Sequence, residues 1–86
     1  MRVRIPSVLH SYTGGRSDAT AAGDSLAAVL GDLDRQYPGL RFRIVDEQDR
    51  LRPHVRVFVD GQLATGLAQP VGPDGEVMIV AALSGG

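Results

Sequence analysis

Val55-Arg56-Val57-Phe58-Val59-Asp60-Gly61 combines a run of β-branched residues with the strongest turn signal in the sequence. The three valines alternate with Arg56 and Phe58, so a strand here places the valines on one face of a sheet and the other two side chains on the opposite face. Asp-Gly after such a run is typical of a two-residue hairpin turn. We therefore predict a strand over residues 55–59, with residues 62–64 pairing back briefly.

Further strands are predicted on both sides of this hairpin. Toward the C-terminus, Pro73-Asp74-Gly75 forms a turn before a β-branched run over residues 76–80. At the N-terminus, residues 1–5 alternate between apolar and arginine side chains, which is the period of a half-buried strand, and Pro6 ends it. Residues 18–22 can return as a weaker strand after a turn over residues 13–17.

One helix is predicted between these strands. Asp24 is suited to the N-cap position, and apolar residues follow at helical spacing: Leu26, Val29, Leu30, Leu33 and Tyr37. The helix stops before Pro38, because proline disfavours helical geometry in the residue that precedes it. We expect residues 40–54 to form an aperiodic, packed connection whose contacts with the core are made by Phe42, Ile44, Val45 and Leu51.

This order of elements predicts an α+β fold, a mixed β-sheet with one main helix packed across one face. If the last strand returns beside the first, the fold is the ubiquitin-like β-grasp. The chain has 86 residues, which allows one domain with a modest core. We expect that domain to span residues 1–83, followed by a flexible tail, Ser84-Gly85-Gly86.

Composition excludes several classes of function. Cysteine is absent, so the sequence offers no disulfide, no thiolate metal site and no cysteine nucleophile. All nine basic residues are arginines, scattered among ten acids for a net charge of −1, which argues against nucleic acid and anionic lipid as partners. We find no signal peptide and no membrane span, and expect a cytoplasmic protein. The lack of lysine is explained either by avoidance of self-acylation or by a bias toward arginine.

The inventory of catalytic side chains is thin. His10 and His54 are far apart in sequence, and neither has a partner at metal-binding spacing. No serine lies in a Gly-x-Ser-x-Gly elbow, and the segment 13–16 lacks the lysine and the spacing of a phosphate-binding loop. The acids Asp46, Glu47 and Asp49 lack a calcium-loop pattern and indicate a solvated loop. We therefore predict no catalytic residue, no metal site and no resident cofactor.

The end of the sequence is its most unusual chemical feature. Ser84-Gly85-Gly86 follows a predicted strand, has almost no side-chain bulk and ends in a carboxylate. Glycine lets a backbone pass through a narrow channel, which an enzyme needs if it must reach the terminal carbonyl carbon. The alternative is a frayed terminus of small residues, which many domains have.

Five segments, in this order, resemble the MoaD/ThiS family of ubiquitin-like sulfur carriers. They are Val3-Arg-Ile-Pro-Ser-Val-Leu9, Gly23-Asp-Ser-Leu-Ala-Ala-Val-Leu30, Val57-Phe-Val-Asp-Gly61, Asp74-Gly-Glu-Val-Met-Ile79 and the terminal Ser84-Gly85-Gly86. Within the family, the sequence looks most like the actinobacterial carriers of cysteine biosynthesis. Two positions depart from the common pattern, since Asp60 replaces an asparagine and Ala81 a proline.

The resemblance implies a mechanism in which the chain is a carrier and not an enzyme. An ATP-dependent adenylyltransferase/sulfurtransferase of the ubiquitin-activating type would adenylate the Gly86 carboxylate and convert it to a thiocarboxylate, with Ser84 and Gly85 threading its active site. In the cysteine route, the sulfur would attack an activated serine on a PLP-dependent, cysteine synthase-like enzyme, and a metallopeptidase would release the product. ATP, PLP and zinc would belong to those partners.

A docking surface for such partners is predicted on the sheet. If Val55, Val57 and Val59 face the helix, the outward residues include an apolar patch with a basic rim: Phe58, Met78, Val80, Arg2, Arg4 and Arg56. The alternatives are that the 40–54 connection or the tail covers this patch, or that the strand register is reversed.

Three other functions stay open at this point. An activated Gly86 could instead form an amide with a lysine of a target, which would make the chain a protein modifier. The chain could be an interaction module whose tail has no role. The sulfur could also go to molybdopterin, thiamine or a secondary metabolite.

Overall fold

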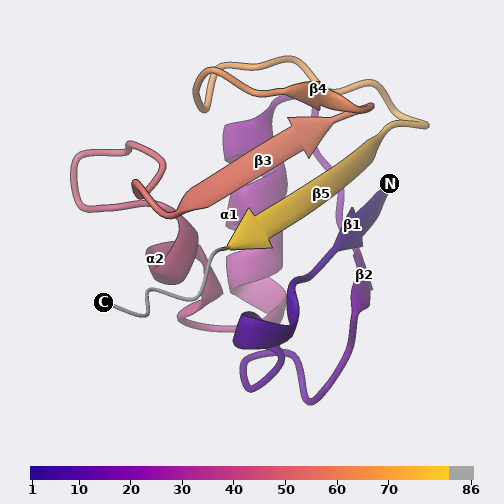
Figure 1. Ribbon diagram of the computed structural model, residues 1–86. Coiled ribbons are helices and arrows are strands. Elements are labelled where there is room, and N and C mark those ends of the chain that lie inside the picture. Colours follow the sequence, from indigo (N-terminus) through magenta and orange to yellow (C-terminus); the bar gives the residue numbers. More distant parts are fainter. Residues whose placement is uncertain (82–86) are drawn as a thin grey trace.

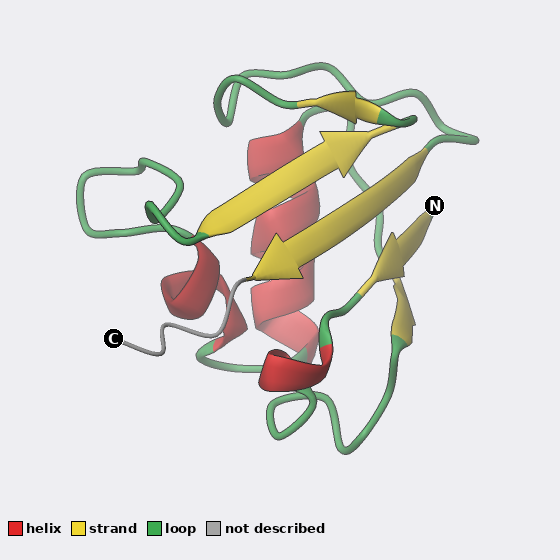
Figure 2. Ribbon diagram, in the orientation of Figure 1, coloured by secondary structure: helices red, strands yellow, loops and turns green. Residues whose placement is uncertain are grey.

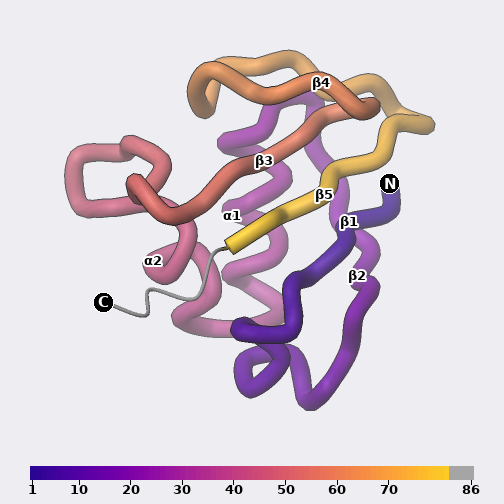
Figure 3. The backbone as a smooth tube through the Cα atoms, in the orientation of Figure 1, coloured from indigo at the N-terminus to yellow at the C-terminus, as the bar shows by residue number. Residues whose placement is uncertain are grey.

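The last strand, β5 (Glu76–Ala81), lies at the centre of a five-stranded mixed sheet in the computed structural model, which describes residues 1–81. β1 (Arg2–Arg4) runs parallel to β5 on one side, and β3 (Val55–Val59) runs antiparallel to it on the other (Figure 1). The edges are β2 (Asp18–Thr20), beside β1, and β4 (Gln62–Leu63), beside β3. The first and last strands therefore lie side by side in the sheet, as Figure 3 shows, and the β-grasp prediction is confirmed.

The main helix, α1 (Leu26–Gln36), crosses one face of this sheet (Figure 2). Its leucine and valine side chains are completely buried against alternate residues of the strands. The fully buried set includes Leu26, Val29, Leu30 and Leu33 from the helix and Val3, Val57 and Val77 from β1, β3 and β5. Removing such apolar surface from water is the main source of the fold's stability.

The start of α1 differs from the prediction. Ser25, not Asp24, is the N-cap, and its hydroxyl accepts a hydrogen bond from the Ala28 amide at 3.2 Å. The carbonyl of Asp24 instead accepts from the Val71 amide at 3.0 Å. The next two helical amides, of residues 26 and 27, donate to the carbonyls of residues 69 and 67. The segment 67–71 thus occupies the helix N-terminus.

The connection over residues 40–54 contains a short helix that the sequence did not predict. Asp34 of α1 fixes the start of α2 (Leu40–Ile44), because its Oδ1 accepts hydrogen bonds from the amides of Gly39 and Arg41, each at 3.1 Å. Ile44 and Val45 are fully buried, as predicted, and Leu51 packs partly buried against the core. Phe42 does not contribute to the core, because 53% of it is exposed and Arg52 lies over its ring at 4.7 Å.

The predicted turns are present. Asp60 and Gly61 both have positive φ, 51° and 83°, as expected for an Asp-Gly hairpin turn. The Asp60 side chain has a second role, because its Oδ1 accepts from the Glu76 amide at 2.9 Å. The β3–β4 turn is therefore linked to the beginning of the central strand. A short 3₁₀ helix, η1 (Ser7–Leu9), follows β1 and was not predicted.

Candidate functional site

The face of the sheet opposite α1, here called the outer face, carries the predicted docking residues. The register places Arg4 beside Met78, Met78 beside Phe58, and Phe58 beside Leu63, so one row crosses four strands. Arg56 lies beside Val80 in a second row. The predicted orientation is confirmed by burial: the three valines of β3 are buried, whereas Arg56 is exposed and Phe58 only half-buried.

The apolar part of the outer face stays accessible among the described residues. Val80 is 42% exposed and Met78 is half-buried. Leu63, which is 52% exposed, extends this patch beyond Phe58 and was missing from the prediction. Its position follows from the hairpin alone, since the two-residue turn sets residue 63 opposite residue 58 on the same face. The patch of Phe58, Leu63, Met78 and Val80 is therefore the main apolar feature of this face.

The three arginines of the rim differ in how firmly they are held. Arg2 donates from Nε to Asp18 Oδ1 at 3.1 Å, and this hydrogen bond raises the pKa of Arg2 and lowers the pKa of Asp18. Arg56 donates from one guanidinium nitrogen to the carbonyls of Pro53 and Val55, at 2.8 and 3.0 Å. Arg4 has only an ion pair of 3.9 Å with Glu76, which is too long for a hydrogen bond.

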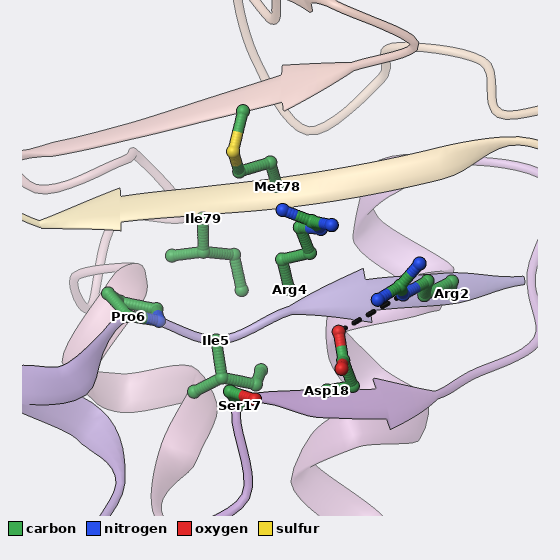
Figure 4. A pocket seen from close by; sticks show the side chains of 8 residues that line it. All are labelled: Arg2, Arg4, Ile5, Pro6, Ser17, Asp18, Met78 and Ile79. Atoms are coloured by element: carbon green, nitrogen blue, oxygen red, sulfur yellow. Dashed lines mark hydrogen bonds and ion pairs between the residues drawn. The ribbon is translucent and has the colours of Figure 1, made fainter.

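A hollow of about 320 Å³ opens on the outer face between the end of β1 and β5. Arg4 reaches across it toward Met78, while Pro6 closes one end (Figure 4). The buried side chains of Ile5 and Ile79 form part of its lining. A second hollow, of about 730 Å³, lies along the β2 edge between Arg16 and Tyr37 and is lined by more polar groups.

The alternatives to a surface site gain no support from the described residues. Within residues 1–81, no group of three potential metal ligands comes together. His10 has its Nε2 3.0 Å from the Ile5 carbonyl, which fits a histidine that closes a turn. Asp46 accepts from the amides of Gln48 and Arg50, at 2.8 and 3.0 Å, and these bonds lower its pKa. The acidic segment 46–49 is thus a closed turn.

Residues 13–16, which lack the phosphate-loop pattern, also form a turn. Thr13 is buried, and its hydroxyl donates to the Arg16 carbonyl at 2.8 Å. Gly14 and Gly15 follow with positive φ, 66° and 89°.

In the part of the chain that the structure describes, no helix is long and apolar enough to cross a membrane.

Ser84, Gly85 and Gly86, the predicted site of chemistry, lie outside the described residues. The description ends at Ala81, the last residue of β5, which pairs with Val55 at the start of β3. The chain therefore reaches its terminal segment from the central strand of the sheet, and Val80 and Arg56 lie side by side one residue earlier on the outer face.

Comparison with known proteins gives a consistent result. No protein-family profile matches the chain. Two mycobacterial proteins, the sulfur carrier protein CysO of Mycobacterium bovis and that of Mycobacterium tuberculosis, are each 35% identical to it, over 98% of this chain and 96% of the relative. The crystal structure of Mycobacterium tuberculosis CysO superposes with a TM-score of 0.89 at 32% identity, covering 95% of this chain and 98% of that one.

Two further structures agree in fold. The Amycolatopsis orientalis BexX/CysO complex contains a chain that matches with a TM-score of 0.90 at 27% identity, over 99% of this chain and 98% of that one. SAMP1 from Haloferax volcanii matches with a TM-score of 0.77 at 23% identity, over 99% and 97%, which shows the shared fold alone. With a relative 35% identical over nearly its whole length and the same β-grasp fold, this chain belongs to the CysO family of ubiquitin-like sulfur carrier proteins.

Proposed function

We propose that this chain carries sulfur as a thiocarboxylate on Gly86. A carboxylate is a poor electrophile, so a partner enzyme first transfers AMP from ATP to a carboxylate oxygen and releases pyrophosphate. A sulfur donor then displaces AMP at the carbonyl carbon. Ser84 and Gly85 pass through the active site of that enzyme, where side-chain bulk would block access. The observation that carries this proposal is the 35% identity to CysO sulfur carriers over 98% of the chain.

The geometry of the described residues supports a carrier in which the folded domain binds the partner and the terminal segment carries the reacting carboxylate. Residues 1–81 form a closed core, and the central strand leads into the terminal segment. The outer face lies on the same strands and offers an accessible apolar patch with three arginines at its rim. We propose that the activating enzyme docks on Phe58, Met78, Val80, Arg2, Arg4 and Arg56 while residues 84–86 enter its active site. The chain itself then supplies no catalytic group and no cofactor.

We further propose that the sulfur is used to make cysteine. The thiocarboxylate sulfur would attack the β-carbon of an activated serine derivative on a PLP-dependent, cysteine synthase-like enzyme, and the leaving group would depart from that carbon. An acyl shift from sulfur to nitrogen gives an amide, which a metallopeptidase hydrolyses to restore the Gly86 carboxylate. The family of the two mycobacterial relatives supports this route over other sulfur acceptors.

The test is the intact mass of the chain after incubation with its purified activating enzyme, ATP and sulfide. We expect a gain of about 16 Da, the exchange of one oxygen for sulfur at the terminal carboxylate. Gly86→Val, or one residue appended after Gly86, should abolish the gain without changing the unfolding midpoint. The matched control is Gly72→Val, because Gly72 is exposed and a Cβ there meets nothing within 4 Å.

Three outcomes would contradict the proposal. No mass gain in the presence of an enzyme that forms the adenylate would leave the chain without a sulfur-carrying step. Covalent adducts to lysines of other proteins, in place of the 16 Da gain, would identify a protein modifier. A chain without Gly85 and Gly86 that retains its function in cells would identify an interaction module.

A further inference from the structure

The hollow beside Arg4 exists because the pairing of β1 with β5 stops early. Arg4 and Met78 form the last pair of the parallel ladder. The Ile5 amide faces the other neighbouring strand and donates to the Ser17 carbonyl at 2.8 Å. The next residue on the β5 side is Pro6, which has no amide hydrogen to donate. The strands β1 and β5 therefore separate after Arg4, and the gap between them is lined by side chains from both.

The two arginines at this hollow are electrostatically unequal. Both side chains are about half exposed, and both come from the same face of β1. Arg2 is already hydrogen-bonded to Asp18 at 3.1 Å, as the dashed line in Figure 4 shows. Arg4 faces Glu76 only at 3.9 Å, which leaves its guanidinium fork able to take a carboxylate in bidentate geometry.

The lining of the hollow combines Arg4 with apolar groups, and its remaining residues are Ser17 and the paired Arg2 and Asp18. Met78 and Pro6 stand beside the opening, and Ile5 and Ile79 contribute the buried part. A short aliphatic stem would contact the apolar lining while a carboxylate at its end reached Arg4. Partial removal from water strengthens such an ion pair relative to one on an open surface. Among side chains, glutamate has this combination of stem and charge.

We propose that a glutamate side chain of the activating enzyme enters the hollow and pairs with Arg4, with its methylenes against Met78 and Pro6. This inference rests on the proposed function, since it concerns the same docking face. It names Arg4 as the anchor of the rim, and it assigns a smaller role to Arg2, whose charge is already compensated by Asp18.

Calorimetric titration of the purified activating enzyme with the full chain, in the absence of ATP, separates docking from chemistry. We expect Arg4→Ala to weaken binding about tenfold, as for an interface anchor, and Arg2→Ala to weaken it about threefold or less. Arg4→Lys keeps the charge but loses the fork, so its loss should fall between these values. Arg35→Ala, on α1 and away from the outer face, should bind like the wild type.

Glu76→Gln distinguishes an anchor from a structural ion pair. If Arg4 serves only to hold Glu76, this variant should weaken binding as much as Arg4→Ala does. If Arg4 holds a glutamate of the partner, removing the competing carboxylate should not weaken binding. The unfolding midpoint of each variant is measured beside its affinity, and Arg4→Lys carries the test should Arg4→Ala not fold.

Equal losses for Arg4→Ala and Arg2→Ala would overturn the inference, because they would indicate diffuse attraction to a basic face. An Arg4→Ala chain that binds like the wild type would overturn it as well. Either result could occur while the wild type still gains about 16 Da with ATP and sulfide, so the failure of this inference differs from the failure of the proposed function. A wild-type chain that gains no mass would be a failure of the latter.

Discussion

The two faces of the sheet use the same strands for opposite purposes. On the inner face, Val57, Val77 and Ile79 are buried beneath α1. On the outer face, their sequence neighbours Phe58, Met78 and Val80 remain partly exposed. Adjacent residues of one strand therefore have different roles: changes on the inner face should act on stability, and changes on the outer face should act on docking.

The largest expected effect comes from neighbouring residues on the two faces of β5. Ile79 is 2% exposed, so Ile79→Ala should lower the free energy of unfolding by about 2–5 kcal/mol, through lost burial and a residual cavity. Val80 is 42% exposed, and Val80→Ala should change it by no more than about 0.5 kcal/mol. Urea titrations followed by circular dichroism measure both.

Binding to the activating enzyme should show the opposite order for variants that remain folded. Val80→Ala removes exposed apolar surface of the patch. Ile79→Ala changes only the buried part of the hollow beside Arg4, so it should weaken binding less than Val80→Ala does. Similar losses of stability for the two variants would mean that the outer face is part of the core, and the comparison between faces would be wrong.

A second prediction concerns Gly23, where the chain packs closely against the first turn of α1. Gly23 leads from β2 into α1 with φ of 155°, and a Cβ there would lie 2.8 Å from both Ala28 Cβ and the Val29 amide nitrogen. Gly23→Ala should therefore cost about 1–3 kcal/mol of unfolding free energy, the range for overpacking. The outer surface of the same helix supplies the control, Gly31→Ala.

Gly31 is exposed on α1, and a Cβ there meets nothing within 4 Å. Alanine at this position should raise the free energy of unfolding by about 0.5–1 kcal/mol, because glycine is a poor residue for a helix interior. If both variants were destabilised, the close packing at Gly23 would not be the cause. The two glycines look alike in the sequence, and only the packing separates them.

The sequence predicted the parts of the fold that depend on local periodicity. The alternation in β3, the Asp60-Gly61 turn and the helical spacing from Leu26 to Leu33 each determine an element and its buried side. The outer-face residues followed from the same alternation. These features need no knowledge of distant contacts, which is why a single sequence was sufficient for them.

The errors arose where a distant segment decides the local structure. Ser25 became the N-cap in place of Asp24 while the 67–71 segment took up the first helical amides. Asp34 of α1 fixes the start of α2, so a stretch without clear periodicity became a helix. Phe42 looked like a core residue by type, yet it stacks under Arg52 at the surface. None of these contacts is encoded by spacing within the segment itself.

A third prediction concerns the link between the β3–β4 turn and the central strand, which contributes residues to both faces. Asp60 joins the β3–β4 turn to β5 through its hydrogen bond from the Glu76 amide. Asp60→Ala loses this acceptor and places alanine at positive φ, so it should cost about 1–2 kcal/mol. Asp60→Asn keeps an acceptor and suits the turn, so its cost should be smaller. Chemical denaturation measures the free energy of unfolding of the wild type and the two variants. An equal cost for both variants would show that the hydrogen bond from the Glu76 amide contributes little.

The smallest expected effect is the acid dependence of stability, which compares carboxylates on the two sides of the sheet. Hydrogen bonds lower the pKa of Asp32 from 3.8, first from the Ala22 amide and then from Arg35, and the bond from Arg2 lowers the pKa of Asp18. A depressed carboxyl pKa stabilises the fold above the ordinary value, and this contribution is lost as pH falls through the folded value. The urea midpoint should therefore be level from pH 7 to about pH 5 and decline below about pH 4.

Asp32→Asn should flatten this acid decline more than Asp18→Asn does. The Asp32 side chain is 16% exposed and accepts a hydrogen bond from a backbone amide at the β2 edge. Asp18 is 48% exposed and accepts only from the exposed Arg2 side chain. Water and salt screen the exposed pair on the outer face more strongly. Urea midpoints at pH 3 and pH 7 for the three chains give the comparison. A larger flattening by Asp18→Asn would place the stronger electrostatic contribution on the outer face, and the assignment of stability to the helix side would then hold for apolar contacts alone.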